Sequence, residues 1–211
     1  MEENGLKARI LKGAEELFMR YGIRSVSMDD IARQLGISKK TLYQHVAEKE
    51  ELVLEVARLN FERNKTLVEC ACNEARNPVE KLALLSMCIR TTLESVNPSV
   101  LFDLQKFHPQ AWKAWLDFKR GYLRESIIGL LKDGMEQGYI RQEIDPEVMA
   151  VMRIEMVQLA FNSELFPGNY TFAQIQEQLY DHFVYGLVTD KGRKLYQKYR
   201  SRINQQPVTH L

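Results

Sequence analysis

Helix-start signals recur along this 211-residue chain and constrain its fold more than any other feature. The pairs Asn77-Pro78, Asn97-Pro98 and Asp145-Pro146 each place a potential capping side chain before a proline suited to the first helical position. Apolar residues recur around these signals at spacings of three and four, and no segment keeps the alternation of a strand. The sequence therefore predicts an all-α fold of about nine or ten helices.

The composition narrows the class of protein further. A chain of this length buries roughly 70% of its unfolded surface, so it needs no disulfide to fold. The N-terminus is acidic and lacks the apolar region of a signal peptide, and no run approaches the length of a membrane span. We therefore expect a cytoplasmic protein that does not associate with a membrane.

The net charge of +1 argues at first against a partner as acidic as DNA. Its distribution changes this interpretation, because residues 1–49 carry +2, residues 50–189 carry −6 and residues 190–202 carry +5. The basic segment near the C-terminus can cover acidic surface of the body or form a solvated helix end. Direct contact of that segment with DNA is a weaker alternative.

The stretch from Ser25 to Leu52 has the signals of two short helices joined by a tight turn. Ser27 can cap the first helix, with Asp30 three residues later able to complete a capping box. Gly36 supplies a left-handed residue at the end of that helix, and Ser38 can cap the next one. Two helices joined by a glycine-containing turn of about three or four residues form a helix-turn-helix.

The second of these helices has two chemically different faces. Leu42 and Val46 are four residues apart and form an inner apolar face. The outer face offers hydrogen-bonding side chains and no acidic one: Lys39, Lys40, Thr41, Tyr43, Gln44 and His45. Such side chains suit contacts to phosphates and base edges, and the charge from Arg20 to Lys49 is +3.

Residues 6–52 carry a wider set of matching motifs: Ala14-Glu15-Glu16-Leu17-Phe18 with Tyr21-Gly22, Asp30-Ile31-Ala32, Leu35-Gly36-Ile37-Ser38, Thr41-Leu42-Tyr43-Gln44-His45-Val46 and Lys49-Glu50-Glu51-Leu52. Jointly they resemble the DNA-binding domain of the TetR (tetracycline-repressor-like) family of transcriptional regulators. The resemblance implies a DNA-binding domain over residues 1–48 and a ligand-binding and dimerisation domain over residues 49–211.

The resemblance also assigns roles to single residues. It implies that Ser27 contacts a phosphate, and that base edges in the major groove are faced by Lys39, Lys40, Thr41 and Gln44. Tyr43, His45 and Lys49 are then expected to hold the DNA backbone. The alternatives are that Tyr43 packs under the following helix, that His45 is a core histidine, and that Lys39 and Lys40 are merely solvated.

An aromatic series in the acidic body is the candidate wall of a ligand pocket. Its members fall within 21 positions: Phe102, Phe107, Trp112, Trp115, Phe118 and Tyr122. This spacing fits a core stripe as well as a pocket, and proteins of the resembled family carry a pocket in this region. Met87, Cys88 and Met156 are candidates for its border. We expect a mainly hydrophobic effector whose polar end is oriented by Gln105, His108 or Arg90.

The helices expected at roughly 146–165 and 172–188 are more apolar than one buried face requires. A two-fold interface would cover this surface, and the resembled family dimerises through such a pair of helices. The candidate interface residues are Val148, Met152, Leu159, Ile175, Leu179 and Phe183. The alternative is a monomer that buries these side chains in its own core.

No constellation for catalysis is visible in the sequence. The four histidines lack metal-ligand spacing, and neither a phosphate loop nor a Gly-x-Ser-x-Gly motif is present. We therefore expect no metal, no cofactor and no enzymatic activity. The resemblance favours a homodimeric repressor released from a palindromic operator by a small molecule. An activator, redox sensing through Cys70, Cys72 or Cys88, and a helical protein-interaction module remain alternatives.

Overall fold

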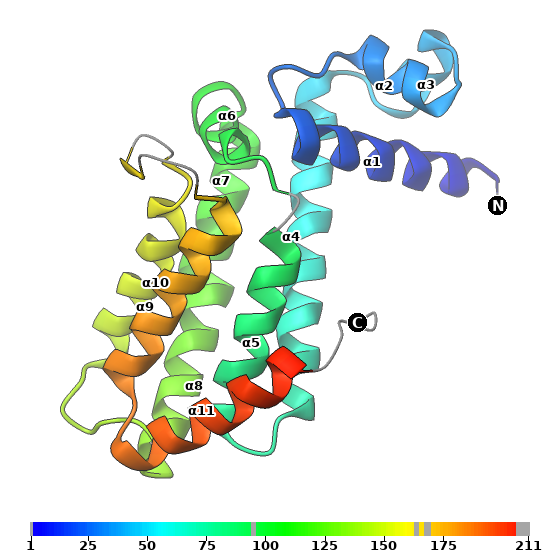
Figure 1. Ribbon diagram of the computed structural model, residues 1–211. Helices are drawn as coiled ribbons and strands as arrows, with labels where there is room; N and C mark the ends of the chain where they lie inside the picture. The colour runs from blue at the N-terminus through cyan, green and yellow to red at the C-terminus, as the bar shows by residue number, and fades with distance from the viewer. Residues whose placement is uncertain (1, 94–95, 163–164, 167–169, 206–211) are drawn as a thin grey trace. The chain divides into compact units, whose positions relative to one another are not determined.

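The computed structural model describes residues 2–93, 96–162, 165–166 and 170–205, most of which are helical (Figure 1). The α-helices are α1 (Glu2–Tyr21), α2 (Met28–Leu35), α3 (Lys39–His45), α4 (Lys49–Glu74), α5 (Pro78–Leu93), α6 (Ser99–Phe107), α7 (Pro109–Phe118), α8 (Arg124–Glu136), α9 (Pro146–Leu159), α10 (Phe172–Leu187) and α11 (Asp190–Gln205). The predicted all-α class is confirmed. Residues 167–169, between the helices expected at roughly 146–165 and 172–188, lie outside the described residues.

The three Asx-Pro pairs start helices as the sequence predicts. The Asn77 side-chain oxygen accepts from the backbone of Val79 at 3.1 Å, and Asp145 accepts from Glu147 at 2.8 Å. Helices α5 and α9 therefore begin at their prolines. Asn97 accepts from the backbone N–H of Ser99 at 2.9 Å, so α6 begins one residue after its proline.

The long helical segment after His108 is divided in two. One π-helical turn, η1 (Lys119–Leu123), separates α7 from α8. Gly121 lies at the centre of this turn, and a glycine weakens the preference for regular α-helix. Gly138 then adopts the left-handed conformation, with φ of +70°, just beyond the end of α8.

The chain forms two compact units that interleave along the sequence. Unit 1 comprises Met1–Asn64 with Ser95–Phe118, and unit 2 comprises Lys65–Glu94 with Lys119–Leu211. Helices α6 and α7 therefore pack with the N-terminal helices, although they follow α5 in sequence. The predicted boundary after residue 48 stays a prediction, because compactness does not test which segment binds DNA.

The core of unit 1 holds the first helices together. Ile10 and Phe18 of α1, Ile31 of α2 and Leu42 of α3 are all at most 1% exposed. Burial of an aliphatic or aromatic side chain of this size stabilises a fold by about 1.5–3 kcal/mol. The short helices α2 and α3 are therefore fixed by packing, since helices of this length are marginal alone.

Unit 2 is built on contacts of α5 with α8, α10 and α11 and of α9 with α8 and α10. The fully buried Tyr196 of α11 donates its hydroxyl to Asp181 of α10 at 2.9 Å. Burial raises the pKa of Tyr196, so this phenol stays neutral. In the described part of the chain, no helix combines the length and apolarity needed to cross a membrane.

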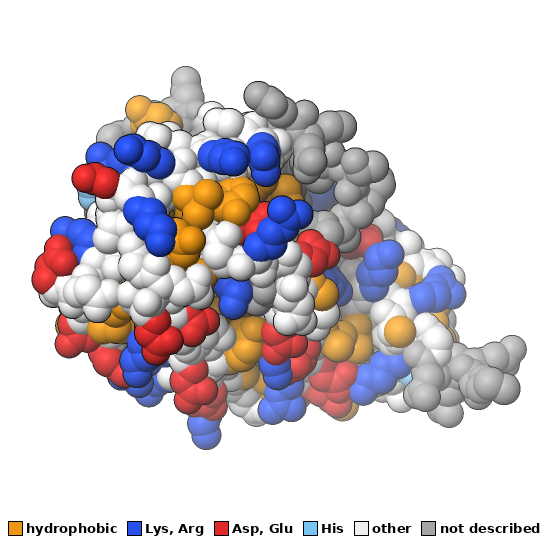
Figure 2. Space-filling model, turned by 90° about the horizontal axis from the view of Figure 1, so that it is seen from below, with side chains coloured by type: hydrophobic (Ala, Val, Ile, Leu, Met, Phe, Trp, Pro, Cys, Tyr) orange, Lys and Arg blue, Asp and Glu red, His pale blue; other side chains and the backbone are white. Residues whose placement is uncertain are grey.

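The basic C-terminal segment forms α11, which crosses α5 and α10 (Figure 1). Arg200 of this helix forms ion pairs with Glu177 at 3.2 Å and with Asp181. Figure 2, seen from the side on which α11 lies, shows Lys and Arg side chains around an apolar area. Part of the basic charge therefore pairs with acidic groups of the same unit, as one of the sequence interpretations expects.

Candidate nucleic-acid interface

Helix α2 begins with the capping box that the sequence predicts. The backbone N–H of Asp30 donates to the Ser27 hydroxyl at 3.2 Å, and the Ser27 backbone N–H donates to the Asp30 carboxylate at 2.9 Å. Ser27 donates its hydroxyl to the same carboxylate at 2.5 Å. These hydrogen bonds lower the pKa of Asp30, because they stabilise the charged form. Ser27 is exposed at the start of the helix.

The turn between α2 and α3 has the chemistry that a helix-turn-helix needs. Gly36 ends α2 with φ of +65°, and the backbone N–H of Ile37 donates to Ala32 at 3.0 Å. Ser38 then caps α3 by accepting from the backbone N–H of Thr41 at 3.0 Å. Two capped helices of fixed geometry follow directly from local sequence.

Helix α3 presents one buried and one exposed face. Leu42 is fully buried and Val46, at its C-terminal end, is 1% exposed. Lys40, Tyr43 and Gln44 are exposed, and almost half of the Tyr43 surface is accessible. This exposure differs from the alternative in which Tyr43 packs under the following helix. His45 is half-buried and lies between the two faces.

Two of the predicted base-facing residues also make contacts within the unit. The Lys39 ammonium lies 2.5 Å from the carboxylate of Asp29 on α2. The Thr41 hydroxyl lies 2.8 Å from that of Ser38, so these two groups share a hydrogen bond. Lys40 and Gln44 have no comparable contact among the described residues, which leaves them the more available pair.

Lys49 points toward the protein backbone in this structure. Its ammonium donates to the carbonyl oxygens of Ile23 at 2.7 Å and Val26 at 2.6 Å. Burial lowers the pKa of Lys49, while the carboxylates of Asp103 and Asp30 favour its charged form. The residue therefore ties the start of α4 to the segment before α2, and the predicted DNA contact stays a prediction.

Helices α6 and α7 add polar contacts that the sequence did not indicate. The Asn97 N–H donates to the Met19 carbonyl at 2.8 Å, and Asp103 accepts from the Arg24 N–H at 2.9 Å. His108, 7% exposed, lies 2.6 Å from the carboxylate of Glu50 on α4. These contacts join residues 58 or more positions apart, so no local pattern encodes them.

The aromatic series does not form one cluster within unit 1. Phe102 and Phe107 are exposed and meet edge-on at 6.4 Å. Trp112 packs on the core of the unit. The ring centres of Trp115 and Phe118 lie 5.7 and 5.1 Å from that of Phe61. The indole nitrogen of Trp115 is buried and has no hydrogen-bond partner in the described part of the chain.

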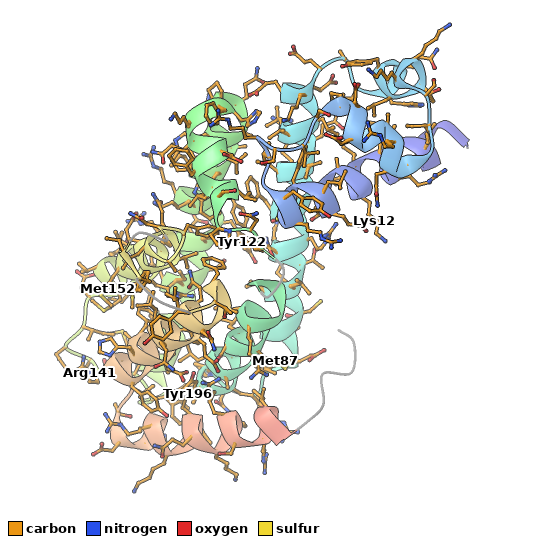
Figure 3. The ribbon with its side chains drawn as sticks, turned by 45° about the horizontal axis from the view of Figure 1, so that its top comes forward. Lys12, Met87, Tyr122, Arg141, Met152 and Tyr196 are labelled. Carbon is orange, nitrogen blue, oxygen red and sulfur yellow. The ribbon has the colours of Figure 1, made fainter. Side chains whose placement is uncertain are left out.

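The remaining ligand candidates, Met87, Tyr122 and Met156, belong to unit 2. Figure 3 labels Met87 on α5 and Tyr122 on η1. Met156 of α9 packs against the core of this unit. The Tyr122 hydroxyl donates to the carbonyl of Lys65 at 3.3 Å. The candidates for the polar end also differ from expectation, since His108 is held by Glu50 and Gln105 is exposed.

The dimer candidates divide between exposed and buried positions. Val148, Met152 and Leu159 of α9 are 57%, 40% and 43% exposed, and Figure 3 labels Met152. Ile175 and Leu179 of α10 are half-buried. Phe183, in contrast, is 3% exposed in the core of its own unit, so its side chain is not available to a second subunit.

No group of three or more His, Cys, Asp and Glu side chains that could hold a metal ion occurs among the described residues. Cys70 is an exposed free thiol, Cys88 is half-buried, and the side chain of Cys72 lies outside the described part. The organised polar surface of unit 1 is therefore the α2–α3 segment.

Comparison with known proteins finds a family model that matches the part of the chain containing α2 and α3. A family model described as "Bacterial regulatory proteins, tetR family" matches residues 10–56. The chain is 28% identical over 188 residues to the uncharacterized HTH-type transcriptional regulator YvaF of Bacillus subtilis, covering 87% of this chain and 96% of the relative. It is 26% identical over 196 residues to the HTH-type transcriptional repressor KstR2 of Mycobacterium tuberculosis, covering 90% and 96%.

A solved structure extends the similarity over the whole fold. The TetR-family transcriptional regulator of Agrobacterium tumefaciens superposes with a TM-score of 0.76 at 16% identity, covering 89% of this chain and 100% of that one. Identity at that level speaks for the fold alone. The helix-turn-helix segment therefore matches the family model, and the helical body shares the fold of the solved regulator.

Proposed function

We propose that this chain, which belongs to the TetR family of transcriptional regulators, is a homodimeric repressor that a small molecule releases from a palindromic operator. The observation that carries the proposal is the exposed polar face of α3, held rigidly by Leu42 and by the caps of Ser27 and Ser38. The repressors named among its relatives support repression over activation.

The DNA contact proposed here involves a few side chains. Gln44 and Lys40 can hydrogen-bond base edges in a major groove, since Gln suits adenine and Lys suits guanine. Ser27, Tyr43 and His45 would then contact the sugar-phosphate backbone and set the register, with Lys39 and Thr41 at the edge of the groove. Two such helices in a dimer would read half-sites at a spacing fixed by the dimer.

The proposed dimer contact lies on α9. Val148, Val151, Met152 and Leu159 are each at least 40% exposed and recur at helical spacing. A stripe of this kind is a typical interface core, because burying it in a second copy removes apolar surface from water. The half-buried Ile175 and Leu179 of α10 can extend the interface.

The effector proposal rests on the interior of the body. Trp115 has an unpaired buried indole N–H, which is a hydrogen-bond donor available to a ligand. Within unit 1 the apolar candidates are Trp112 and Phe118, whereas Tyr122, Met87 and Met156 belong to unit 2 and stay candidates from the sequence alone. Phe102 and Phe107 are left out, because both are exposed.

Binding to a selected duplex tests the proposal. The full-length protein selects a palindromic duplex from random sequence, and fluorescence anisotropy gives its Kd. We expect Gln44→Ala and Lys40→Ala each to raise Kd at least about tenfold. Lys132→Ala, an equal change of charge at an exposed position of α8, is the matched control and should bind like the unmodified protein. Equal affinity of all three variants would contradict the assigned face.

A further inference from the structure

An arginine is buried in the interior of unit 2 without a counter-ion among the described residues. Arg153 of α9 is 5% exposed, and its Nη1 atom has no hydrogen-bond partner. No ion pair joins it to any carboxylate of the described residues. Buried charges are normally paired, because removing a charge from water without compensation is costly. The position therefore needs an explanation beyond the packing of α9.

The neighbouring groups do not supply the missing negative charge. The Arg153 guanidinium lies 4.9 Å from the ring centre of Tyr180 on α10. Tyr180 donates its hydroxyl to the Leu82 carbonyl at 2.9 Å, and burial raises its pKa, so the phenol remains neutral. The nearby acids of α10, Glu177 and Asp181, are paired with Arg200. The ring offsets part of the desolvation cost and leaves the guanidinium charge unbalanced.

A second unpaired polar group lies one helical turn away. Gln176 of α10 is fully buried, and its Nε2 donates to the Val157 carbonyl at 2.8 Å, while its Oε1 has no partner. Arg153 contacts Tyr180, and Val157 contacts Gln176. The two contacts are therefore four residues apart along α9, from 153 to 157, and four residues apart along α10, from 180 to 176. Four residues correspond to about one turn, which places the free donor and the free acceptor on the same α9–α10 interface.

We propose that Arg153 and Gln176 form the polar end of a ligand site that takes a small organic acid. The carboxylate accepts from Arg153 Nη1, and a hydroxyl or N–H of the same molecule donates to Gln176 Oε1. A carboxylate fits better than a phosphate, because one buried positive charge is neutralised by a monoanion. The regulatory meaning of this site rests on the function proposed above, but binding of the acid does not.

The first test compares acids with their neutral amides on the full-length protein. Hexanoate, octanoate and phenylacetate are added beside hexanamide, octanamide and phenylacetamide, and the melting temperature is recorded. We expect at least one acid to raise Tm by about 3 °C or more at ten times its Kd, while its amide does not. If no acid stabilises the protein more than its amide, the proposal is overturned.

The second test removes the guanidinium. Arg153→Met should weaken binding of the stabilising acid by about 10- to 100-fold, the effect of losing a hydrogen bond to a charged group. Arg141→Met, at an exposed arginine labelled in Figure 3, is the matched control and should leave the affinity unchanged. An Arg153→Met protein that binds the acid as tightly as the unmodified protein contradicts the site.

The ligand-free proteins give an independent readout. Because Arg153→Met removes an unpaired buried charge, its Tm without acid should equal or exceed that of the unmodified protein. A fall of several degrees, or failure to fold, would show that Arg153 is structural and would overturn the proposal. Gln176→Leu also loses the hydrogen bond to the Val157 carbonyl, so its Tm should fall, and it should weaken binding only of acids that carry a hydroxyl or N–H. None of these measurements uses DNA, so their failure is distinct from failure of the repressor proposal.

Discussion

The two compact units differ in how their buried charged groups are held, although unit 1 also has buried polar atoms without a hydrogen-bond partner among the described residues, Glu50 Oε1 and Trp115 Nε1. In unit 1 the buried Asp103 and His108 have partners, and Lys49 donates two hydrogen bonds to backbone carbonyls. In unit 2 Arg153 and Gln176 are buried with atoms that lack partners. Buried polar groups that are fully hydrogen-bonded make a structure rigid, whereas a buried polar group without a partner is costly unless a ligand pairs with it. The difference fits the proposals that unit 1 carries the DNA contact and that the interior of unit 2 binds an organic acid.

The largest expected effect concerns the apolar stripe of α9 in unit 2. Val148→Asp combined with Met152→Asp puts two like charges where two copies are proposed to meet. We expect the dimer to dissociate, which sedimentation velocity would show as a shift to the monomer mass. Operator affinity should fall by more than about 100-fold, because one half-site contact is lost.

The matched control for that change is Glu125→Gln combined with Lys132→Gln on α8, at exposed polar positions. This variant should sediment like the unmodified protein. If the α9 double variant also remains dimeric, the interface lies elsewhere on the molecule.

The next largest effect is expected from Leu42, the buried side chain that holds α3 to the core of unit 1. Leu42→Ala empties a fully buried site beneath α3. We expect the free energy of unfolding to fall by about 2–5 kcal/mol, the usual cost of a large-to-small change in a core. Urea denaturation followed by circular dichroism measures this. A loss below about 1 kcal/mol would mean that α3 is not held by its apolar face.

A substitution of Lys49 tests whether this side chain stabilises the fold or contacts DNA. Lys49→Met deletes the two hydrogen bonds to Ile23 and Val26 and should lower the free energy of unfolding by about 1.5–3 kcal/mol. The slope of log Kd for the operator against log salt should stay the same, since no phosphate contact is lost. A smaller slope with an unchanged free energy of unfolding would support the contact of Lys49 with the DNA backbone that the sequence predicts.

The smallest effect is the response of the α2 cap to acid. The folded-state pKa of Asp30 is lowered, so its stabilising contribution is present above the ordinary pKa of 3.8 and is lost as pH falls through the folded value. Asp30→Asn should therefore flatten the acid limb of the stability curve slightly. Thermal melts between pH 2 and 6 compare the two proteins, with Asp29→Asn as the neighbouring control. Identical acid limbs for Asp30→Asn and the unmodified protein would argue against the cap.

Local chemistry explains how much of this molecule could be predicted from sequence. The caps at Ser27, Ser38 and Asn77 act over two or three residues, so their spacing in the chain suffices to place the helix starts. The inner face of α3 follows in the same way from Leu42 and Val46. The match to the family model covers Ser27, Ser38, Leu42 and Val46, so it draws on the same local pattern.

Tertiary packing explains what the sequence did not reveal. Asp103 meets Arg24 across 79 residues, and the Lys49 contacts span 23 and 26 residues. On α9 the apolar pattern alone did not separate the exposed Met152 from the buried Arg153 beside it. The unpaired guanidinium could not have been foreseen, because it depends on what α10 places opposite.

The central claim, that the exposed face of α3 reads DNA sequence, is tested most directly by affinities for single-base-pair variants of the selected operator. The unmodified protein should discriminate at every position of each half-site that it contacts. We predict that Gln44→Ala loses discrimination, by about 1–3 kcal/mol, at one base pair in each half-site and keeps it at the others. Unchanged discrimination at every position of the operator would contradict the account.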